Sequence, residues 1–201
     1  MKPVTTLPAP AGNCVALTFD DGPHAGATAA VLDILVDESV PATFFVVGAR
    51  VAAHPDLVKR EVAHGMGIGV HSWDHVRLGD RDRQFVTDQL TRTLDLLWSL
   101  DADPCLFRPP FGQWNETTVD VAHQLGLTTV TWDVAPRDWS APGAEEIVDR
   151  VVKGVKPGSI VLFHDQGPGT ADTIAALPSI IRRLRDDGVS FVDLGDRLVP
   201  Q

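Results

Sequence analysis

The sequence VALTFDDGP, at residues 15–23, contains the features that decide the fold of this chain. Residues 15–19 form a short, almost continuous apolar run. Strands buried on both faces have this composition, and parallel sheets covered by helices are built from such strands. Two adjacent carboxylates, Asp20 and Asp21, follow directly. We therefore expect a buried parallel strand that carries two acids to one edge of a sheet.

Similar apolar runs recur along the chain, and segments with helical periodicity separate them. The further predicted strands are residues 43–47, 67–70, 106–108, 128–132, 159–163 and 190–192. Apolar spacing, capping residues and terminal glycines predict helices around residues 30–35, 55–65, 85–100, 115–126 and 174–184. Seven strands alternating with about six helices indicate an α/β fold, for which closure into a barrel is plausible.

The bulk properties narrow the class of protein. At 201 residues, we expect one domain over residues 13–201, preceded by an extended N-terminal arm at residues 1–12. The formal net charge of -10 argues against binding to nucleic acid or to anionic membranes.

No apolar run approaches the roughly 20 residues that span a bilayer. Residues 1–7 lack the apolar core of a signal peptide, so we expect a cytoplasmic protein, or a secreted or cell-wall-associated one if a leader has been removed. Cys14 and Cys105 are expected to be two buried thiols, with a disulfide as the alternative.

The polar residues of interest all follow predicted strands. They are Asp20 and Asp21, His71 and His75, Arg108, Asp138 with Trp139, and His164. The carboxyl ends of parallel strands meet at one edge, where α/β folds assemble their active sites. Two histidines four residues apart can share a metal with one carboxylate. The second carboxylate would then be available as a base for hydrolysis.

Each of these groups also has an ordinary structural interpretation. Asp-Gly-Pro is turn chemistry, which would account for Asp20 and Asp21. His71 and His75 would be solvated histidines of a surface turn. His164 would be a core histidine, and Arg108 a surface charge. Their gathering at one sheet edge favours the functional interpretation.

Taken in order, these motifs resemble those of the polysaccharide deacetylase family, carbohydrate esterase family four. The resemblance covers residues 13–199 and rests on the motifs TFDDGP (18–23), HSWDH (71–75), RPPFG (108–112), DW (138–139) and LFH (162–164). It implies a distorted (β/α) barrel with about seven parallel strands, a divalent metal, and removal of N-acetyl groups from amino sugars.

The resemblance also implies a role for each site residue. Asp21, His71 and His75 would hold the metal, zinc in the first place, with Co2+ or another divalent ion as alternatives. Asp20 would be the base that deprotonates the water, with Arg108 bridging to it. His164 would be the acid, kept charged by Asp138. The Phe111 N–H would stabilise the oxyanion, and Trp139 and Leu162 would wall the acetyl pocket. Pro110 is the fourth residue expected at the substrate.

The chain departs from the family pattern at three positions. Phe111 stands where tyrosine is common, Ala135 where the fourth motif usually begins with aspartate, and Val70 where asparagine is common. None of these removes a catalytic role. Outside the motifs, His24 is a candidate substrate contact, Trp114 and Trp132 could stack on a sugar or pack in the core, and the role of Asp133 stays open. His54, His64 and His123 are expected at the surface.

The first functional hypothesis is hydrolysis of N-acetyl groups on N-acetylglucosamine glycans, either chitin oligosaccharides or peptidoglycan. The protein would then be a hydrolase of carbon–nitrogen bonds other than peptide bonds, and we expect a monomer. One alternative is a metallo-amidohydrolase acting on a small intracellular amide, cyclic imide or acetylated metabolite, or an acetyl xylan esterase. Another is a non-catalytic carbohydrate-binding protein, which the full set of site residues opposes.

Overall fold

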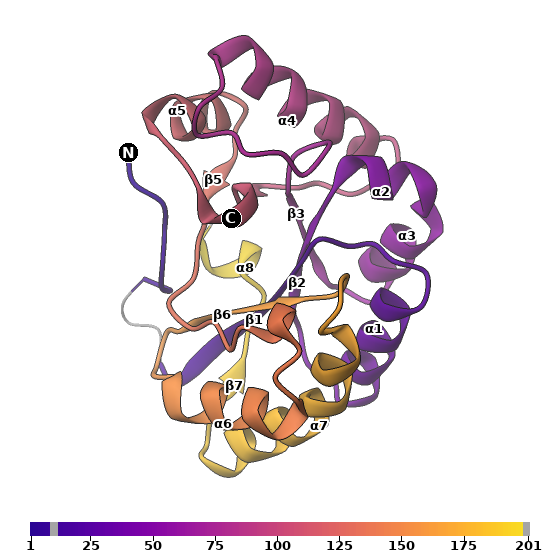
Figure 1. The fold of residues 1–201 in the computed structure, drawn as a ribbon, viewed down its shortest axis with the longest axis vertical. Helices are drawn as coiled ribbons and strands as arrows, with labels where there is room; N and C mark the ends of the chain where they lie inside the picture. The colour runs from indigo at the N-terminus through magenta and orange to yellow at the C-terminus, as the bar shows by residue number, and fades with distance from the viewer. Residues whose placement is uncertain (9–11, 199–201) are drawn as a thin grey trace.

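The computed structural model describes residues 1–8 and 12–198. Its central feature is a seven-stranded parallel sheet with the order β5-β4-β3-β2-β1-β6, in which β7 also pairs with β1 (Figure 1). The strands are β1 (Cys14–Asp20), β2 (Thr43–Val46), β3 (Gly67–Val70), β4 (Leu106–Phe107), β5 (Thr128–Thr129), β6 (Ile160–His164) and β7 (Ser190–Phe191). The predicted α/β fold with about seven parallel strands is confirmed. The sheet curls into an incomplete barrel.

The alternation of side chains along each strand separates two cores. In β1, Val15, Leu17 and Phe19 belong to the large core under the helices, whereas Cys14 and Ala16 belong to the smaller core inside the curled sheet. Because successive residues of a strand point to opposite faces, the even-numbered residues of β1 face inwards. This register directs the carboxylate that ends β1 into the barrel.

The N-terminal segment lies across the gap between the two edge strands. Val4 N–H donates to the Thr129 carbonyl at 2.9 Å, and Leu7 N–H donates to the Gly158 carbonyl at 2.8 Å. Leu7 is buried in the inner core. The segment therefore bridges β5 and the start of β6, which have no direct ladder between them.

Helices cover the outer face of the sheet (Figure 1). They are α1 (Ala27–Asp37), α2 (Gly48–Ala53), α3 (Pro55–Ala63), α4 (Arg83–Trp98), α5 (Glu116–Gln124), α6 (Ala144–Gly154), α7 (Thr170–Asp186) and α8 (Gly195–Leu198), with 3₁₀ turns η1 (Pro110–Gly112) and η2 (Asp138–Ser140). Asn115 caps α5 by accepting from Thr118 N–H at 2.8 Å, as expected from the sequence. None of the helices in the described ranges is long and apolar enough to cross a membrane.

The observed elements differ from the sequence predictions in detail. Strand β5 ends at Thr129 rather than at Trp132. Val130 N–H still donates to the Phe107 carbonyl at 2.8 Å, and Val130 also forms an isolated bridge with Val4 of the N-terminal segment. The helices α2, α6 and α8 were not predicted individually. The first and last of these have six and four residues, too few to show a clear apolar period.

Candidate active site

A cavity of about 500 Å³ opens at the carboxyl ends of the strands. It is lined by Asp20, Asp21, His71, His75, Phe111, Trp132, Trp139, Leu162, His164, Gln166, Gly167 and Pro168. The structure thus gathers residues that the sequence predicted at the ends of β1, β3 and β6. Asp138 and Arg108 lie behind the lining and contact it through side-chain hydrogen bonds.

Asp20 lies at the floor of the cavity in a buried ion pair. The Arg108 guanidinium donates from Nη1 to Asp20 Oδ1 at 2.7 Å, and to the Thr18 hydroxyl at 2.7 Å. Arg108 is fully buried, with its guanidinium stacked over the Phe45 ring at 4.0 Å. Arg108 Nη2 donates to the Thr131 carbonyl at 3.0 Å, whereas Nε has no hydrogen-bond partner among the described residues. Additional hydrogen bonds such as that from Nη2 help to hold a buried charge pair in place. The pair therefore fixes the orientation of the Asp20 carboxylate. Its second oxygen, Oδ2, faces His71.

Asp21, His71 and His75 converge on one point. Their candidate ligand atoms all lie within 4.8 Å of one another. Asp21 Oδ1 is 2.9 Å from His75 Nε2 and 3.4 Å from His71 Nε2, and it is buried without a hydrogen-bond partner. Burial raises the pKa of Asp21, but the two imidazoles outweigh this effect and hold that pKa well below its usual range. An orphaned buried carboxylate oxygen facing two imidazole nitrogens fits a bound divalent cation.

The surroundings orient these three residues. His71 Nδ1 lies 2.7 Å from the Arg108 carbonyl oxygen, which leaves Nε2 facing the cluster. Both Asp21 and His75 have positive φ, at 82° and 54°, a conformation that non-glycine residues rarely adopt. Such strain persists where the surroundings enforce it, often at functional sites.

Two buried side chains that the sequence analysis missed hold the loops of this cluster. Gln89 of α4 accepts from Trp73 and Asp74 N–H, each at 3.0 Å, and so fixes the turn between the two histidines. Asp165 accepts from the Thr28 hydroxyl at 2.5 Å, and its own N–H donates to the Asp20 carbonyl at 3.1 Å. No spacing pattern marked these two residues, because their partners lie far along the chain.

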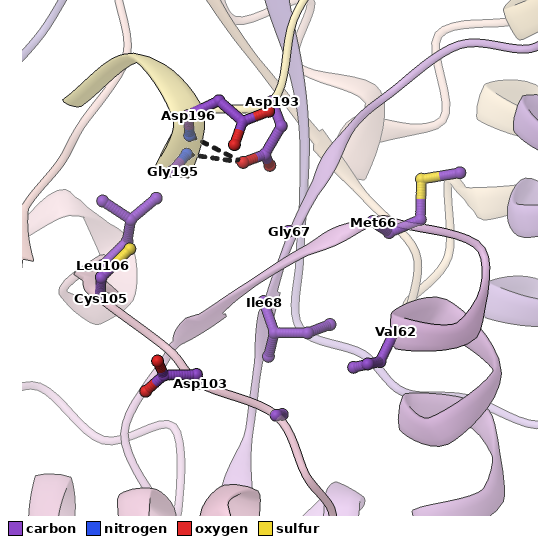
Figure 2. Close-up of a pocket in the computed structure, with 11 residues that line it drawn as sticks. Val62, Met66, Gly67, Ile68, Asp103, Cys105, Leu106, Asp193, Gly195 and Asp196 are labelled. Atoms are coloured by element: carbon purple, nitrogen blue, oxygen red, sulfur yellow. Dashed lines mark hydrogen bonds between the residues drawn. The ribbon is translucent and has the colours of Figure 1, made fainter. Parts of the chain in front are cut away.

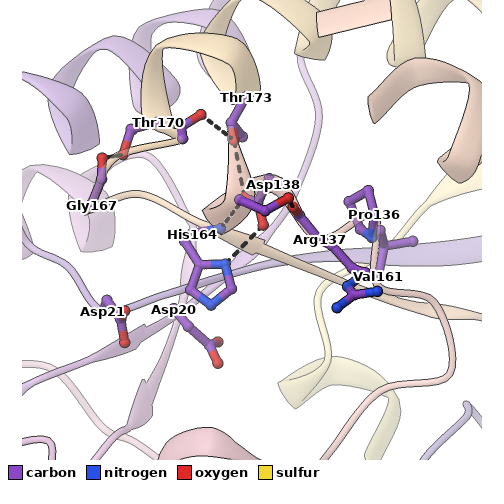
Figure 3. Close-up of polar contacts among 12 residues, drawn as sticks. Asp20, Asp21, Pro136, Arg137, Asp138, Val161, His164, Gly167, Thr170 and Thr173 are labelled. Atoms are coloured by element: carbon purple, nitrogen blue, oxygen red, sulfur yellow. Dashed lines mark hydrogen bonds and ion pairs between the residues drawn. The ribbon is translucent and has the colours of Figure 1, made fainter. Parts of the chain in front are cut away.

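His164 stands in the cavity wall, backed by Asp138 (Figure 3). His164 Nδ1 is 2.9 Å from Asp138 Oδ1, and His164 N–H donates to Asp138 Oδ2 at 2.7 Å. The Thr173 hydroxyl donates to the same Oδ2 at 3.0 Å. Burial lowers the pKa of His164, but the hydrogen bond to Asp138 and the neighbouring negative charges outweigh it and raise the pKa to about 9. His164 is therefore protonated at neutral pH, with Nε2 free to donate.

The mouth of the cavity is apolar and open. Phe111 and Trp139 line it and are 53% and 51% exposed, while Leu162 is buried behind them. Phe111 has a φ of 60°, and its ring centroid lies 4.7 Å from that of His75. Pro110, expected at the substrate, is buried and does not line the cavity. The segment 166–168, which does line it, carried no recognisable motif.

The structure also places the residues outside the motifs that were considered as possible site residues. His24 is exposed, with Nδ1 accepting from Ala27 N–H at 3.3 Å, and does not line the cavity. Trp132 lines the cavity, whereas Trp114 does not. Asp133 accepts from the Ser159 hydroxyl and from Ile160 N–H, so it anchors the start of β6.

The remaining predictions from the sequence concern three histidines expected at the surface and the two cysteines. His64 and His123 are exposed as expected, whereas His54 is partly buried. Cys14 is a buried thiol, and Cys105 is a half-buried one.

Comparisons with known proteins identify the family of this chain. The polysaccharide deacetylase family model matches residues 8–130. A peptidoglycan-N-acetylglucosamine deacetylase of Bacillus cereus is 38% identical over 186 residues, covering 92% of this chain and 87% of that protein. A chitooligosaccharide deacetylase of Sinorhizobium fredii is 39% identical over 187 residues, covering 87% of this chain and 86% of that protein.

Solved structures show the same architecture. The Bc1960 peptidoglycan N-acetylglucosamine deacetylase superimposes with a TM-score of 0.92 at 32% identity, covering 96% of this chain and 91% of that one. A carbohydrate esterase family 4 pseudoenzyme of Bacillus anthracis superimposes with a TM-score of 0.91 at 26% identity, covering 99% and 70%. The architecture is therefore shared by active and inactive proteins, and the argument for activity rests on the site residues.

Proposed function

We propose, from the premise that this chain belongs to the polysaccharide deacetylase family, that its cavity hydrolyses the N-acetyl groups of N-acetylglucosamine glycans. The reaction makes it a hydrolase of carbon–nitrogen bonds other than peptide bonds. One observation carries the proposal. A candidate base and a candidate acid border a single cluster of three possible metal ligands. The base is Asp20, paired with Arg108, and the acid is His164, paired with Asp138.

Asp21, His71 and His75 would hold one divalent ion, and zinc suits two imidazole nitrogens and a carboxylate. When bound, the ion lends Lewis acidity to a water molecule and to the acetyl carbonyl. The buried, orphaned Asp21 Oδ1 supports this assignment. The identity of the ion is part of the proposal.

The protein's own groups move the protons. Asp20 accepts the proton of the attacking water, and Arg108 keeps its carboxylate oriented towards the cavity. The Phe111 N–H donates to the oxygen that becomes negative in the tetrahedral intermediate. His164 then gives its Nε2 proton to the departing nitrogen, which would otherwise leave as a poor amide anion. Trp139 and Leu162 enclose the acetyl methyl group.

The test is acetate release from N-acetylglucosamine oligomers of increasing length. Native, chelator-stripped and zinc-restored protein are compared, with melting temperature as a control for folding. Release that disappears on stripping and returns with zinc is expected. A protein that binds zinc at the cluster but releases no acetate from any N-acetylglucosamine glycan, neutral or charged, would contradict the proposal and favour a non-catalytic binding function.

A further inference from the structure

Two arginines lie against aromatic rings that line the cavity. Arg77 follows β3, and its guanidinium carbon lies 5.3 Å from the centre of the Phe111 ring. Arg137 precedes η2, and its guanidinium carbon lies 5.5 Å from the centre of the Trp139 ring. Both rings line the cavity. We call Arg77 and Arg137 the rim arginines.

The rim arginines have no negative partner among the residues that the structure describes. Both are exposed, and neither makes an ion pair or a guanidinium hydrogen bond there. By contrast, other surface arginines lie against carboxylates: Arg60, Arg83, Arg150, Arg183 and Arg185. Arg81, Arg92 and Arg182 are also exposed without an ion pair in the described part of the chain, but none of them contacts a ring that lines the cavity. What distinguishes the rim arginines in this chain of net charge -10 is their contact with Phe111 and Trp139.

The acids inside the cavity do not need the rim arginines as counterions. Asp20 is paired with Arg108, and Asp138 with His164. Asp21 faces the two imidazoles and the cation they would hold. The charge of the rim arginines is therefore available to a ligand. A guanidinium stacked on an aromatic ring keeps its in-plane donors for a carboxylate.

From this arrangement we propose that the rim arginines bind a carboxylate carried by the glycan next to the N-acetylglucosamine being hydrolysed. The inference rests on the proposed function and specifies its substrate class: an anionic glycan of the peptidoglycan kind is favoured over neutral chitin oligomers. The carboxylate has two sources in such a glycan, the lactyl ether of the neighbouring sugar or an attached peptide. Recognition of either adds binding at the rim and leaves the reacting groups unchanged.

The test compares kcat and KM on four substrates. These are neutral N-acetylglucosamine oligomers, peptidoglycan strands with free lactyl carboxylates, the same strands with those carboxylates amidated, and strands carrying peptides. The variants are Arg77→Gln, Arg137→Gln and the double variant. Arg81→Gln is the matched control, because Arg81 is also exposed and stacks at 5.0 Å on a ring, Phe85, that does not line the cavity.

We expect each rim substitution to raise KM for carboxylate-bearing strands by roughly two- to fivefold, with kcat and all values for neutral oligomers unchanged. The effect should shrink as salt is added, because exposed charges are screened. Arg→Lys variants should recover part of the loss, and Arg81→Gln should have no effect. Whichever strand loses most on substitution, lactyl or peptide-bearing, identifies the source of the carboxylate.

Equal KM changes on neutral and charged substrates, or no change on either, would overturn the inference while leaving the deacetylase in place. Amidated strands that lose as much on substitution as the more sensitive of the lactyl and peptide-bearing strands would also overturn it. Failure of native enzyme on all four substrates would instead contradict the proposed function, so the two outcomes are separate.

Discussion

The two ends of the parallel sheet both carry a hollow lined by aspartates, yet they differ in what opposes those acids. At the carboxyl end, Asp20 and Asp138 are met by Arg108 and His164, which come from other strands. At the amino end, a hollow of about 360 Å³ holds Asp193, Asp103, Asp196 and Cys105 (Figure 2). There, Asp193 accepts from the Gly195 and Asp196 N–H groups of α8 and from the Thr43 hydroxyl, at 2.7, 3.2 and 2.6 Å.

The difference indicates that the carboxyl end is suited to chemistry, whereas the acid at the amino end has a structural role. Acids that face histidines and a buried arginine can exchange protons and bind a cation. An acid whose oxygens already accept from backbone N–H groups and a hydroxyl stabilises a helix start and is unavailable for chemistry. Among the described residues, a cluster able to hold a metal occurs only at the carboxyl end.

The largest effect should come from the acid at the floor of the active cavity. Asp20→Asn keeps the shape of the side chain but removes the proposed base, so acetate release should fall by roughly 10²- to 10⁴-fold. It also leaves Arg108 without its counterion, so stability should decrease. Kinetics and zinc content measured below the melting temperature check this expectation. Unaltered acetate release would show that another group is the base.

The next effect concerns the pH range in which His164, the proposed acid, carries its proton. Its pKa of about 9 keeps the imidazole protonated at neutral pH, and the proton is lost as pH rises past that value. Asp138→Asn removes the carboxylate that raises this pKa, so the alkaline limb of kcat/KM should move to lower pH. NMR titration of His164 in metal-free protein checks the assignment independently, and an unchanged pKa in the variant would contradict it.

The raised pKa of His164 also contributes to stability. A histidine whose pKa is higher in the folded than in the unfolded state stabilises the fold fully below about pH 6.5. That contribution is lost as pH rises from there to about 9.

Glu61 on α3 is a buried acid that lines neither of the two hollows. It is fully buried, and neither carboxylate oxygen has a hydrogen-bond partner. Burial, assisted by the charge of Asp165, raises its pKa well above the usual value. Stability is therefore lost as pH rises from the unfolded pKa of about 4.3 towards the folded one.

Replacing this acid should stabilise the protein. Glu61→Met is expected to raise the free energy of unfolding by about 2 kcal/mol or more at pH 8, and by less at pH 5. Denaturant unfolding at both pH values measures this, with kcat as the control for an intact site. Destabilisation at pH 8 would mean that Glu61 has a stabilising partner.

At the amino end, the same kind of substitution should change stability alone. Asp193→Ala removes the acceptor for two N–H groups of α8 and for Thr43, which should cost about 1–3 kcal/mol of unfolding free energy. Acetate release and zinc content should match those of native protein. A loss of activity larger than the loss of folded protein would contradict this expectation and show that the two ends are functionally coupled.

The smallest effect is expected at Cys105. Burial and the nearby Asp193 charge raise the pKa of this thiol, so it is a poor nucleophile and a poor metal ligand. Cys105→Ser should change the free energy of unfolding by less than about 0.5 kcal/mol and leave the kinetics unchanged. Slow labelling by a thiol reagent at neutral pH is the companion measurement.

The sequence predicted the active end much better than the other end. Strand-terminal acids and histidines such as Asp20 and His71 could be found because the carboxyl ends of parallel strands share one edge, whatever the details of packing. The register that turns Asp20 and Arg108 towards each other lies beyond a one-dimensional pattern, since both faces of β1 are apolar.

Contacts between distant parts of the chain account for what was missed. Thr43 and Asp193 are 150 residues apart, and α8 has only four residues. The bridge from Val4 to Val130, just after the end of β5, likewise joins segments that no local pattern relates. Supporting side chains such as Gln89 and Asp165 are defined by what they contact in the fold.

The comparison between the two ends can be tested directly by anomalous X-ray scattering at the zinc edge, on crystals soaked in zinc. We expect one strong peak among Asp21, His71 and His75, within bonding distance of the two Nε2 atoms, and no peak near Asp193 and Cys105. A peak at the amino end, or none at the carboxyl end, would contradict the assignment of the carboxyl end as the metal-dependent reaction centre.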